Sequence, residues 1–171
     1  MTGLDLSLQN IIMNKEKFII LITAVNKAGV LNKILSLCRR RRYSLQSVTA
    51  GPTEKANIYN ITLVLFENKN RVDQIVNQIN KIIEVISTNA FIPKDVIDKE
   101  LILIILKNKK STDKILKNNE HDINVRVLKK INNNFILEII GEGTEVDHAL
   151  SLLSKKDIVK LVRSGSVAIK L

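Results

Sequence analysis

The stretch from Phe18 to Thr53 constrains the fold of this 171-residue chain more than any other. It opens with an isoleucine-rich apolar run, Phe18–Val25, which is typical of a strand that is buried on both faces. A polar turn at Asn26–Gly29 follows, and apolar residues then recur at helical spacing from Val30 to about Arg41. A second extended segment runs from Tyr43 to Gly51. A strand, a glycine-containing turn, a helix and a strand, with no catalytic group among them, favour a binding module.

The following residues complete a recognisable unit. Apolar and polar residues alternate over Ile58–Phe66, which predicts a half-buried strand. Asn70, with Asp73 three residues later, predicts a helix start, and apolar spacings of three and four extend that helix through Ile83. A strand over Val85–Ile92 closes the series. The order βαββαβ predicts a ferredoxin-like domain, with four antiparallel strands and two helices on one face.

The second half of the chain repeats this order. The predicted elements are a strand at Glu100–Lys107, a helix at Ser111–Asn119, strands at Ile123–Val127 and Phe135–Ile140, a helix from about Thr144, and a strand at Ile158–Ile169. Ser111 or Thr112 would cap the first of these helices, and Thr144 with Asp147 would form a capping box in the second. We therefore predict an α+β chain of two tandem ferredoxin-like domains. The expected parts are a leader at 1–16, a first domain at 17–92, a linker at 93–98 and a second domain at 99–171.

Composition narrows the class of protein. The apolar runs are far shorter than the ~18 residues that a membrane span needs, and the first sixteen residues lack the pattern of a secretory signal. The one cysteine, Cys38, excludes a disulfide framework within the chain, and its place on the apolar side of a helix predicts a buried side chain. These features favour a cytoplasmic chain with no membrane part.

The net charge of +10 raises the question of nucleic acid. The lysines are scattered, and the one dense run, Arg39–Arg42, falls where cations complement the end of a helix. RNA-recognition domains share the βαββαβ order, but they stack bases on aromatic residues of the sheet. Aromatic residues make up only 4% of this chain, and Tyr59 and Phe66 are expected on opposite faces of their strand. The sequence therefore disfavours nucleic-acid binding, which ranks third among the functions considered.

No catalytic or metal site is predicted. The two histidines stand apart from each other and from the cysteine, and no pair of acids is marked for acid–base chemistry. Gly141-Glu142-Gly143 precedes a helix but lacks the third glycine of a dinucleotide site.

What remains is the turn at Asn26–Gly29. The first N–H groups of a helix lack partners within it and carry partial positive charge, which suits a carboxylate. Gly29 permits a close approach or a positive φ, and Asn26 can offer an amide. A zwitterionic amino acid fits this chemistry. An ordinary helix entry fits the residues equally well, so both interpretations stay open.

These segments resemble the small regulatory subunit of acetolactate synthase (acetohydroxyacid synthase), whose N-terminal part is an ACT domain. The family pattern has a strand leading into Asn-x-x-Gly-x-Leu, then a helix, Arg-Gly-Tyr-Asn-Ile and an Ala-Pro-Thr turn, and later Arg-Glu-[Leu/Ile]-x-Leu and Ala-Arg-[Ser/Thr]-Gly. The similar segments here are Asn26–Leu31 (NKAGVL), Arg41–Leu45 (RRYSL), Gly51–Thr53 (GPT), Lys99–Leu103 (KELIL) and Leu161–Gly165 (LVRSG). Their common order along the chain carries the resemblance.

The resemblance implies a subunit without catalysis of its own. It would bind and activate a large catalytic subunit that carries thiamine diphosphate, Mg²⁺ and often FAD, a transferase that makes 2-acetolactate or 2-aceto-2-hydroxybutyrate for branched-chain amino acids. It also implies a homodimer of side-by-side ACT domains that bind an effector, valine in the family, between the turn of one chain and the second strand of its partner. The implied effector-binding residues are Asn26, Lys27, Ala28, Gly29, Val30, Leu31, Ser44 and Leu45. The alternative is a stand-alone ACT-domain amino acid sensor that acts on another partner.

Two residues depart from the family pattern. Ser44 stands where the family has an asparagine associated with the effector, so we expect the response to valine to be weakened, altered or absent. Arg42 stands where the family has glycine. Arginine pays about 1 kcal/mol in the left-handed conformation, so either the helix ends differently or the chain accepts this cost.

Overall fold

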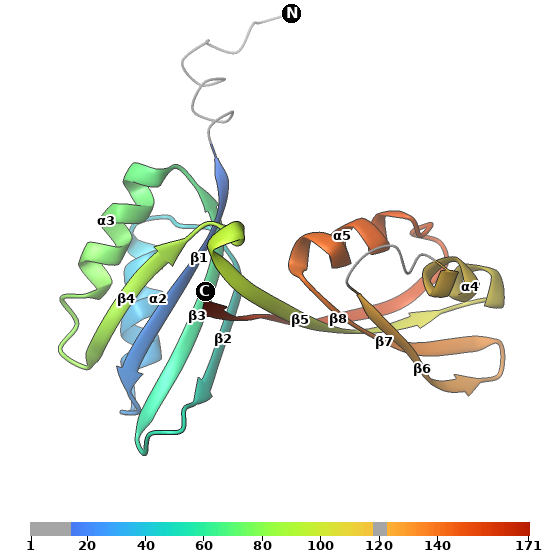
Figure 1. Ribbon diagram of the computed structural model, residues 1–171, viewed down its shortest axis with the longest axis horizontal. Coiled ribbons are helices and arrows are strands. Elements are labelled where there is room, and N and C mark those ends of the chain that lie inside the picture. The colour runs from blue at the N-terminus through green and yellow to red at the C-terminus, as the bar shows by residue number, and fades with distance from the viewer. Residues whose placement is uncertain (1–14, 118–122) are drawn as a thin grey trace, which may run out of the picture. The chain divides into compact units, whose positions relative to one another are not determined.

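The computed structural model describes residues 15–117 and 123–171, and two compact units divide them (Figure 1). One unit extends to Val96 and also takes in Ala168–Leu171, and the other is Ile97–Val167. The domain limits predicted from the sequence are 17–92 and 99–171. They differ from these units in the assignment of residues 93–98 and 168–171, and they stay a prediction. Most of the predicted leader lies outside the described residues.

The first unit has the predicted βαββαβ order. Its elements are β1 (Glu16–Val25), α2 (Val30–Arg40), β2 (Leu45–Pro52), β3 (Ile58–Glu67), α3 (Lys69–Ile79) and β4 (Val85–Phe91), followed by the short 3₁₀ helix η1 (Pro93–Asp95). The strands form one antiparallel sheet in the order β2-β3-β1-β4. The isoleucine-rich strand β1 is central, as its two apolar faces predict, and β2 is an edge strand.

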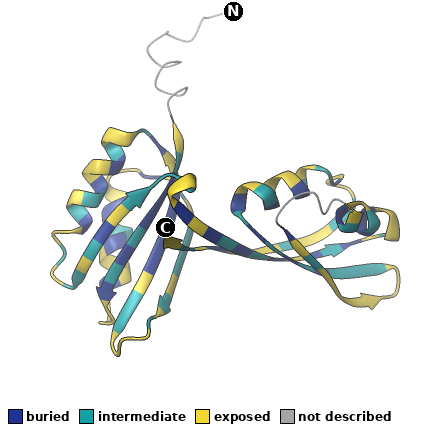
Figure 2. Cartoon of the chain, viewed as in Figure 1, coloured by how far each residue is buried: buried dark blue, intermediate teal, exposed yellow. Residues whose placement is uncertain are grey.

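The two faces of β1 contribute to two different cores. Alternate residues, among them Ile20 and Ile22, pack under α2 and α3 with Ile34 and Ile75. Figure 2 shows that the outer sides of these helices are exposed. On the opposite face, Ile19 lies in a smaller cluster whose other members are Val64, Val96, Leu21, Phe91 and Ala168.

Two further contacts hold the residues after Ala168 on the first unit. The Lys170 ammonium lies 5.8 Å from the centre of the Phe91 ring, and the Leu171 N–H donates to the Asp95 carbonyl at 3.3 Å. The first unit is therefore completed by the last four residues of the sequence.

The second unit repeats the architecture. Its elements are β5 (Val96–Leu106), α4 (Lys109–Lys117), β6 (Asn124–Ile131), β7 (Asn134–Gly141), α5 (Gly143–Ser151) and β8 (Ile158–Lys170). The sheet order β6-β7-β5-β8 matches that of the first unit strand for strand. The core lies between this sheet and its helices and includes Ile102, Ile104, Ile115 and Val146. The predicted fold, two tandem ferredoxin-like domains, is confirmed.

Several helix ends differ from the prediction. Asn68, not Asn70, caps α3, and its side chain accepts a hydrogen bond from the Arg71 N–H at 3.0 Å. The helix also ends at Ile79, so Ile83 is not part of it and is 97% exposed. The chain needs residues 80–84 for the turn into β4, and this requirement overrides the helical spacing.

The caps in the second unit were also predicted wrongly. Asn108 accepts from the Ser111 N–H at 2.9 Å, so α4 begins before the expected Ser111 and Thr112. Helix α5 begins at Gly143, and no side chain caps it. The predicted end of α4 at Asn119 lies outside the described residues.

The end of α2 answers the question raised by Arg42. Arg42 has φ 56°, in the left-handed region. The Tyr43 N–H donates to the Cys38 carbonyl at 3.0 Å, and the Arg42 N–H donates to the Arg39 carbonyl at 3.0 Å. These two bonds form the Schellman motif in which glycine is the usual residue. The helix therefore ends as it would with glycine, and the chain accepts the conformational cost.

Two expectations from composition can be compared with the structure. Cys38 is buried, as predicted, and burial raises the pKa of its thiol. Within residues 15–117 and 123–171, none of the helices has the length and apolar character to cross a membrane.

Candidate functional site

The turn between β1 and α2 is held from both sides. The Val25 N–H donates to the Glu84 carbonyl at 2.8 Å, and the Asn26 N–H donates to the Asn57 carbonyl at 2.7 Å. Gly29, with φ 89°, occupies the capping position of α2. It offers no side chain, and the first turn of the helix contains no acidic residue. The positive end of α2 is thus left uncompensated by its own sequence.

A small hollow of about 190 Å³ adjoins this helix start. Its lining consists of Ala24, Val25, Asn26, Lys27, Gly29, Val30, Leu31, Ala50, Tyr59 and Ile61. Aliphatic side chains predominate, while Asn26 and Lys27 supply polar groups. The volume is below the ~300 Å³ at which pockets for drug-sized ligands begin, so the hollow suits a molecule of few atoms.

The structure brings together five of the eight predicted effector-site residues: Asn26, Lys27, Gly29, Val30 and Leu31. Ala28 is in the same turn but is exposed and outside the lining. Ser44 and Leu45 lie at the opposite end of the sheet. Leu45 pairs with Leu65, whereas the hollow adjoins Ala50 near the other end of β2, a separation of about 17 Å at the usual strand rise.

An ion pair fixes the helix start to the sheet. Lys33 Nζ lies 2.7 Å from Glu84 Oε1, and this hydrogen bond holds the pKa of the Glu84 carboxyl below its usual value. The Glu84 carbonyl also accepts from Val25, so one residue secures both the strand end and the helix.

Sequence reasoning missed five residues of the lining: Ala24 and Val25 at the end of β1, Ala50 of β2, and Tyr59 and Ile61 of β3. Val25 pairs with Ile58, so the start of β3 runs alongside the turn. The signal was present in the alternation of β3, which places Tyr59 and Ile61 on one face, but the register between β1 and β3 is not encoded locally.

The corresponding turn in the second unit, between β5 and α4, is arranged differently. Asn108 caps α4 and its amide also donates to Asp157 Oδ1 at 3.3 Å. The Ser111 hydroxyl donates to Asp157 Oδ2 at 2.6 Å, and the Lys107 N–H donates to the Asp157 carbonyl at 3.0 Å. This helix start is filled by side chains of the protein itself.

Two motifs of the second unit meet in one charge cluster. Arg163 of β8 donates to both carboxylate oxygens of Glu100 of β5, at 2.8 and 2.6 Å, and to Asp147 of α5 at 2.7 Å. Glu100 is buried. Both carboxylates raise the pKa of Arg163, with the Glu100 hydrogen bonds contributing most. The Lys99–Leu103 and Leu161–Gly165 motifs therefore act in structure, by joining two strands and a helix.

Other chemistry finds little support in the part of the chain that the structure describes. Residues 15–117 and 123–171 contain no group of three or more His, Cys, Asp or Glu side chains placed to hold a metal. Phe18, an expected aromatic of β1, is buried in the core beneath the helices and is not available for base stacking.

Comparison with known proteins shows which family this chain is similar to. A model of the AHAS small subunit-like ACT domain matches residues 20–87, and a model of the small subunit of acetolactate synthase matches residues 99–171. The acetolactate synthase small subunit of Bacillus subtilis is 31% identical over 153 residues, which cover 89% of each chain. A probable acetolactate synthase small subunit of Archaeoglobus fulgidus is 29% identical, with 89% of this chain and 95% of the relative covered.

A solved structure supports the fold. The small subunit of acetolactate synthase from Thermotoga maritima superposes with a TM-score of 0.78. The match covers 91% of this chain and 98% of that one, at 22% sequence identity.

Proposed function

The chain belongs to the family of acetolactate synthase small subunits, and on this premise we propose that it is a regulatory subunit that binds and activates a separate catalytic large subunit. That large subunit would carry thiamine diphosphate and Mg²⁺, and often FAD in this family, and this chain would change its rate of forming 2-acetolactate. We place the assembly in the cytoplasm, the compartment that the single cysteine favours.

The observation that carries the regulatory role is the hollow at the start of α2. The N–H groups of the first turn would receive the carboxylate of a free amino acid, and Asn26 could accept a hydrogen bond from its ammonium group. The aliphatic lining, including Val30 and Ile61, suits a short branched side chain. A branched-chain amino acid, valine above all, is the proposed effector.

A homodimer would complete this site. Strand β2 is an edge of the first sheet, so its outer hydrogen-bonding groups are available to a second copy. In an antiparallel β2 pair, the start of one strand lies beside the end of the other. Ser44 and Leu45 of a partner chain would then approach Ala50 and the hollow. This geometry supports the implied pairing of the turn of one chain with the second strand of the other.

The first test of the proposal is assembly. The chain is mixed with the large subunit from the same cell, and co-elution and acetolactate formation are measured. We expect a complex and a higher rate. Valine binding without co-elution would instead support the stand-alone sensor, and the absence of both would refute the proposal.

Effector binding is tested with an intrinsic probe. The chain contains no tryptophan and two tyrosines, of which Tyr59 lines the hollow. In a Tyr43→Phe variant, tyrosine fluorescence reports on Tyr59 alone, and we expect it to change on titration with valine more than with an acidic amino acid.

Substitution of Asn26 separates regulation from activation. We expect Asn26→Ala to remove the valine response, because it removes the side-chain amide at the hollow, and to leave activation of the large subunit intact. Asn89→Ala, an exposed asparagine of β4, serves as the control. Equal loss of response and activation would show that the turn serves assembly instead.

A further inference from the structure

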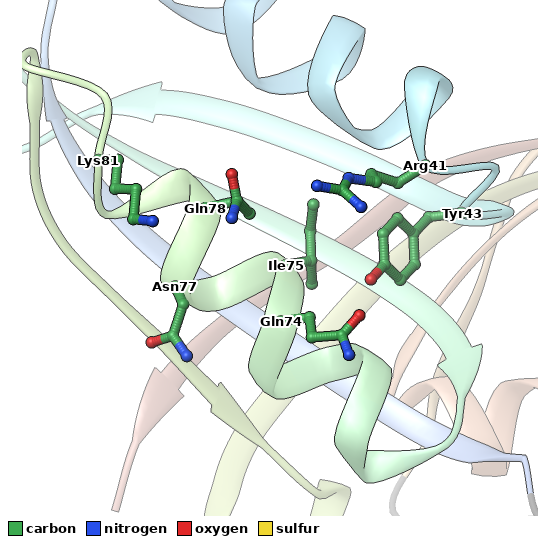
Figure 3. Close-up of a pocket in the computed structure, with 7 residues that line it drawn as sticks. All are labelled: Arg41, Tyr43, Gln74, Ile75, Asn77, Gln78 and Lys81. Atoms are coloured by element: carbon green, nitrogen blue, oxygen red, sulfur yellow. The ribbon is translucent and has the colours of Figure 1, made fainter.

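A second, larger hollow lies at the other end of α2. It measures about 420 Å³, within the range of small-molecule sites. Arg41 and Tyr43, just after α2, form one side, and the exposed face of α3 forms the other (Figure 3). The residues from α3 and the turn after it are Gln74, Ile75, Asn77, Gln78 and Lys81. Helix α2 spans about 16 Å at the usual rise, so this hollow is distinct from the proposed effector site.

The lining contains two cations and no acid. Among residues 15–117 and 123–171, neither the Arg41 guanidinium nor the Lys81 ammonium has a side-chain partner. The nearby acids are taken up elsewhere: Glu67 pairs with Arg71 at 3.0 Å, and Asp73 pairs with Lys69 at 3.8 Å.

The walls of this hollow are held in place. The Tyr43 hydroxyl donates to the Arg71 carbonyl at 2.7 Å, and the Arg71 guanidinium lies 4.7 Å from the centre of the Tyr43 ring. Arg71 Nη2 also donates to the Arg41 carbonyl at 3.0 Å. Burial raises the pKa of Tyr43, which further favours the protonated hydroxyl that makes this bond. Arg41 therefore projects from a fixed backbone.

We propose that this hollow binds a small molecule that carries a phosphate group. The guanidinium of Arg41 and the ammonium of Lys81 supply charged donors, and the amides of Gln74, Asn77 and Gln78 supply neutral donors. A phosphate has more acceptor oxygens than a carboxylate and a higher charge, so it matches this donor-rich lining better. Ile75 and Tyr43 are buried, so the side chains that the hollow exposes to a ligand are the polar ones. The inference concerns a separate site and does not depend on the proposed response to valine.

The test uses pyrophosphate as the probe and citrate as the carboxylate comparison, titrated into the full chain in a calorimeter at about 0.15 M salt, where exposed charges are largely screened. We expect saturable binding of one pyrophosphate per chain, about tenfold tighter than citrate, a difference equivalent to one additional charge-assisted contact. Absence of pyrophosphate binding, or equal binding of citrate, would overturn the proposal.

Charge-matched variants locate the site. Arg41→Gln with Lys81→Gln should weaken pyrophosphate binding about tenfold or more, since each substitution removes a charged hydrogen-bond donor. Arg39→Gln with Lys94→Gln removes the same charge from exposed positions outside the lining and should leave the affinity within about twofold, because surface charges are screened. Equal weakening in both variants would show attraction to net charge without a site.

Fluorescence distinguishes this site from the effector site. In a Tyr59→Phe variant, Tyr43 is the only tyrosine of the chain, and we expect its emission to change with pyrophosphate. Saturable binding without a change in Tyr43 emission would place the anion elsewhere and refute the assignment. Valine binding is followed through Tyr59 in the Tyr43→Phe variant, and pyrophosphate binding through Tyr43 in the Tyr59→Phe variant. The two proposals can therefore fail independently of each other.

Discussion

The helix that follows the first strand begins in opposite ways in the two domains. In the first domain, Gly29 leaves the start of α2 without a side-chain cap, beside a hollow. In the second domain, Asn108, Ser111 and Asp157 fill the start of α4 with hydrogen bonds of the protein itself. The strand order is the same in both. A helix start is available to a ligand only where the local sequence leaves it open, so topology alone does not define the site.

The charged residues extend this contrast. The second domain commits Arg163 to Glu100 and Asp147, whereas the first domain leaves Arg41 and Lys81 facing a hollow without side-chain partners among the described residues. Arg163 thus serves internal structure, whereas Arg41 and Lys81 stand at the surface beside a hollow.

The largest expected effect tests the internal role of the second domain's charges. Arg163→Leu leaves the buried Glu100 without its main partner and should cost about 2 kcal/mol, below the ~3–5 kcal/mol of a fully buried pair because Arg163 is partly exposed. Urea unfolding, with hydrogen exchange to locate the loss in the second domain, measures it. Arg126→Leu breaks the pair between the exposed Arg126 and the half-buried Glu138, and it should cost less than about 1 kcal/mol. Equal losses would contradict the role of the cluster.

The next effect tests the open helix start. Gly29→Ala should cost about 1–2 kcal/mol, because φ is 89° there and alanine is strained in the left-handed region. Beyond the adjoining residues of the chain, no atom lies within 4 Å of the added methyl group, so the loss is one of backbone conformation. Thermal unfolding measures it, with Gly51→Ala as the control, since that site is equally open and has no positive φ. A loss no larger than that of the control would show that the turn relaxes.

The start of α4, which protein side chains fill, should be less sensitive to substitution than the start of α2. Asn108→Ala removes the cap of α4 and should cost about 1 kcal/mol, a typical value for a lost cap. Hydrogen exchange of the Ser111 amide follows the loss directly. Asn108→Ser keeps an acceptor for that amide without placing a second carboxylate beside Asp157, and it should protect the amide better than alanine does. Identical exchange in both variants would argue against capping as the cause.

The smallest expected effect is a gain in stability, whereas the substitutions above are expected to destabilise. Arg42→Gly should stabilise the first domain by somewhat less than about 1 kcal/mol, because glycine relieves the strain at φ 56° but adds entropy to the unfolded chain. Urea unfolding measures the gain. Arg40→Gly, at the last residue of α2, should instead destabilise, by at most the ~1 kcal/mol that glycine costs in a helix interior. A loss in Arg42→Gly would show that the arginine side chain contributes contacts that offset its conformation.

The fold could be predicted because its signals are local. The apolar runs of β1 and β5, the alternation in β3 and the helical spacing after Val30 each lie within about ten residues and agree with one another. The error at the start of α3 arose because a charged residue is buried there, contrary to what its type predicts. Glu67 extends β3 and is buried, because Arg71 and Lys15 pair with it, so the helix cap falls on Asn68 and not on Asn70.

The site could be predicted only in part for a different reason. The turn at Asn26–Gly29 is contiguous, and the structure places most of it at the hollow. Tyr59 and Ile61 reach the same place through the pairing of β1 with β3, a contact between distant segments that one sequence does not specify. Ser44 precedes β2 and Leu45 begins it, at the opposite end of the sheet from the hollow, so a single chain does not bring together all the residues that the resemblance implies.

The packing of Ala168 and the bond from Leu171 to Asp95 bear on how the protein is made. During synthesis on the ribosome the first domain emerges early, yet Ala168–Leu171 emerge only after residues 97–167 have been added. Domains usually fold in order of emergence. Here the apolar cluster around Ile19 acquires Ala168 only after residues 97–167 have been made, so the first domain begins to fold before one of its own packing residues exists.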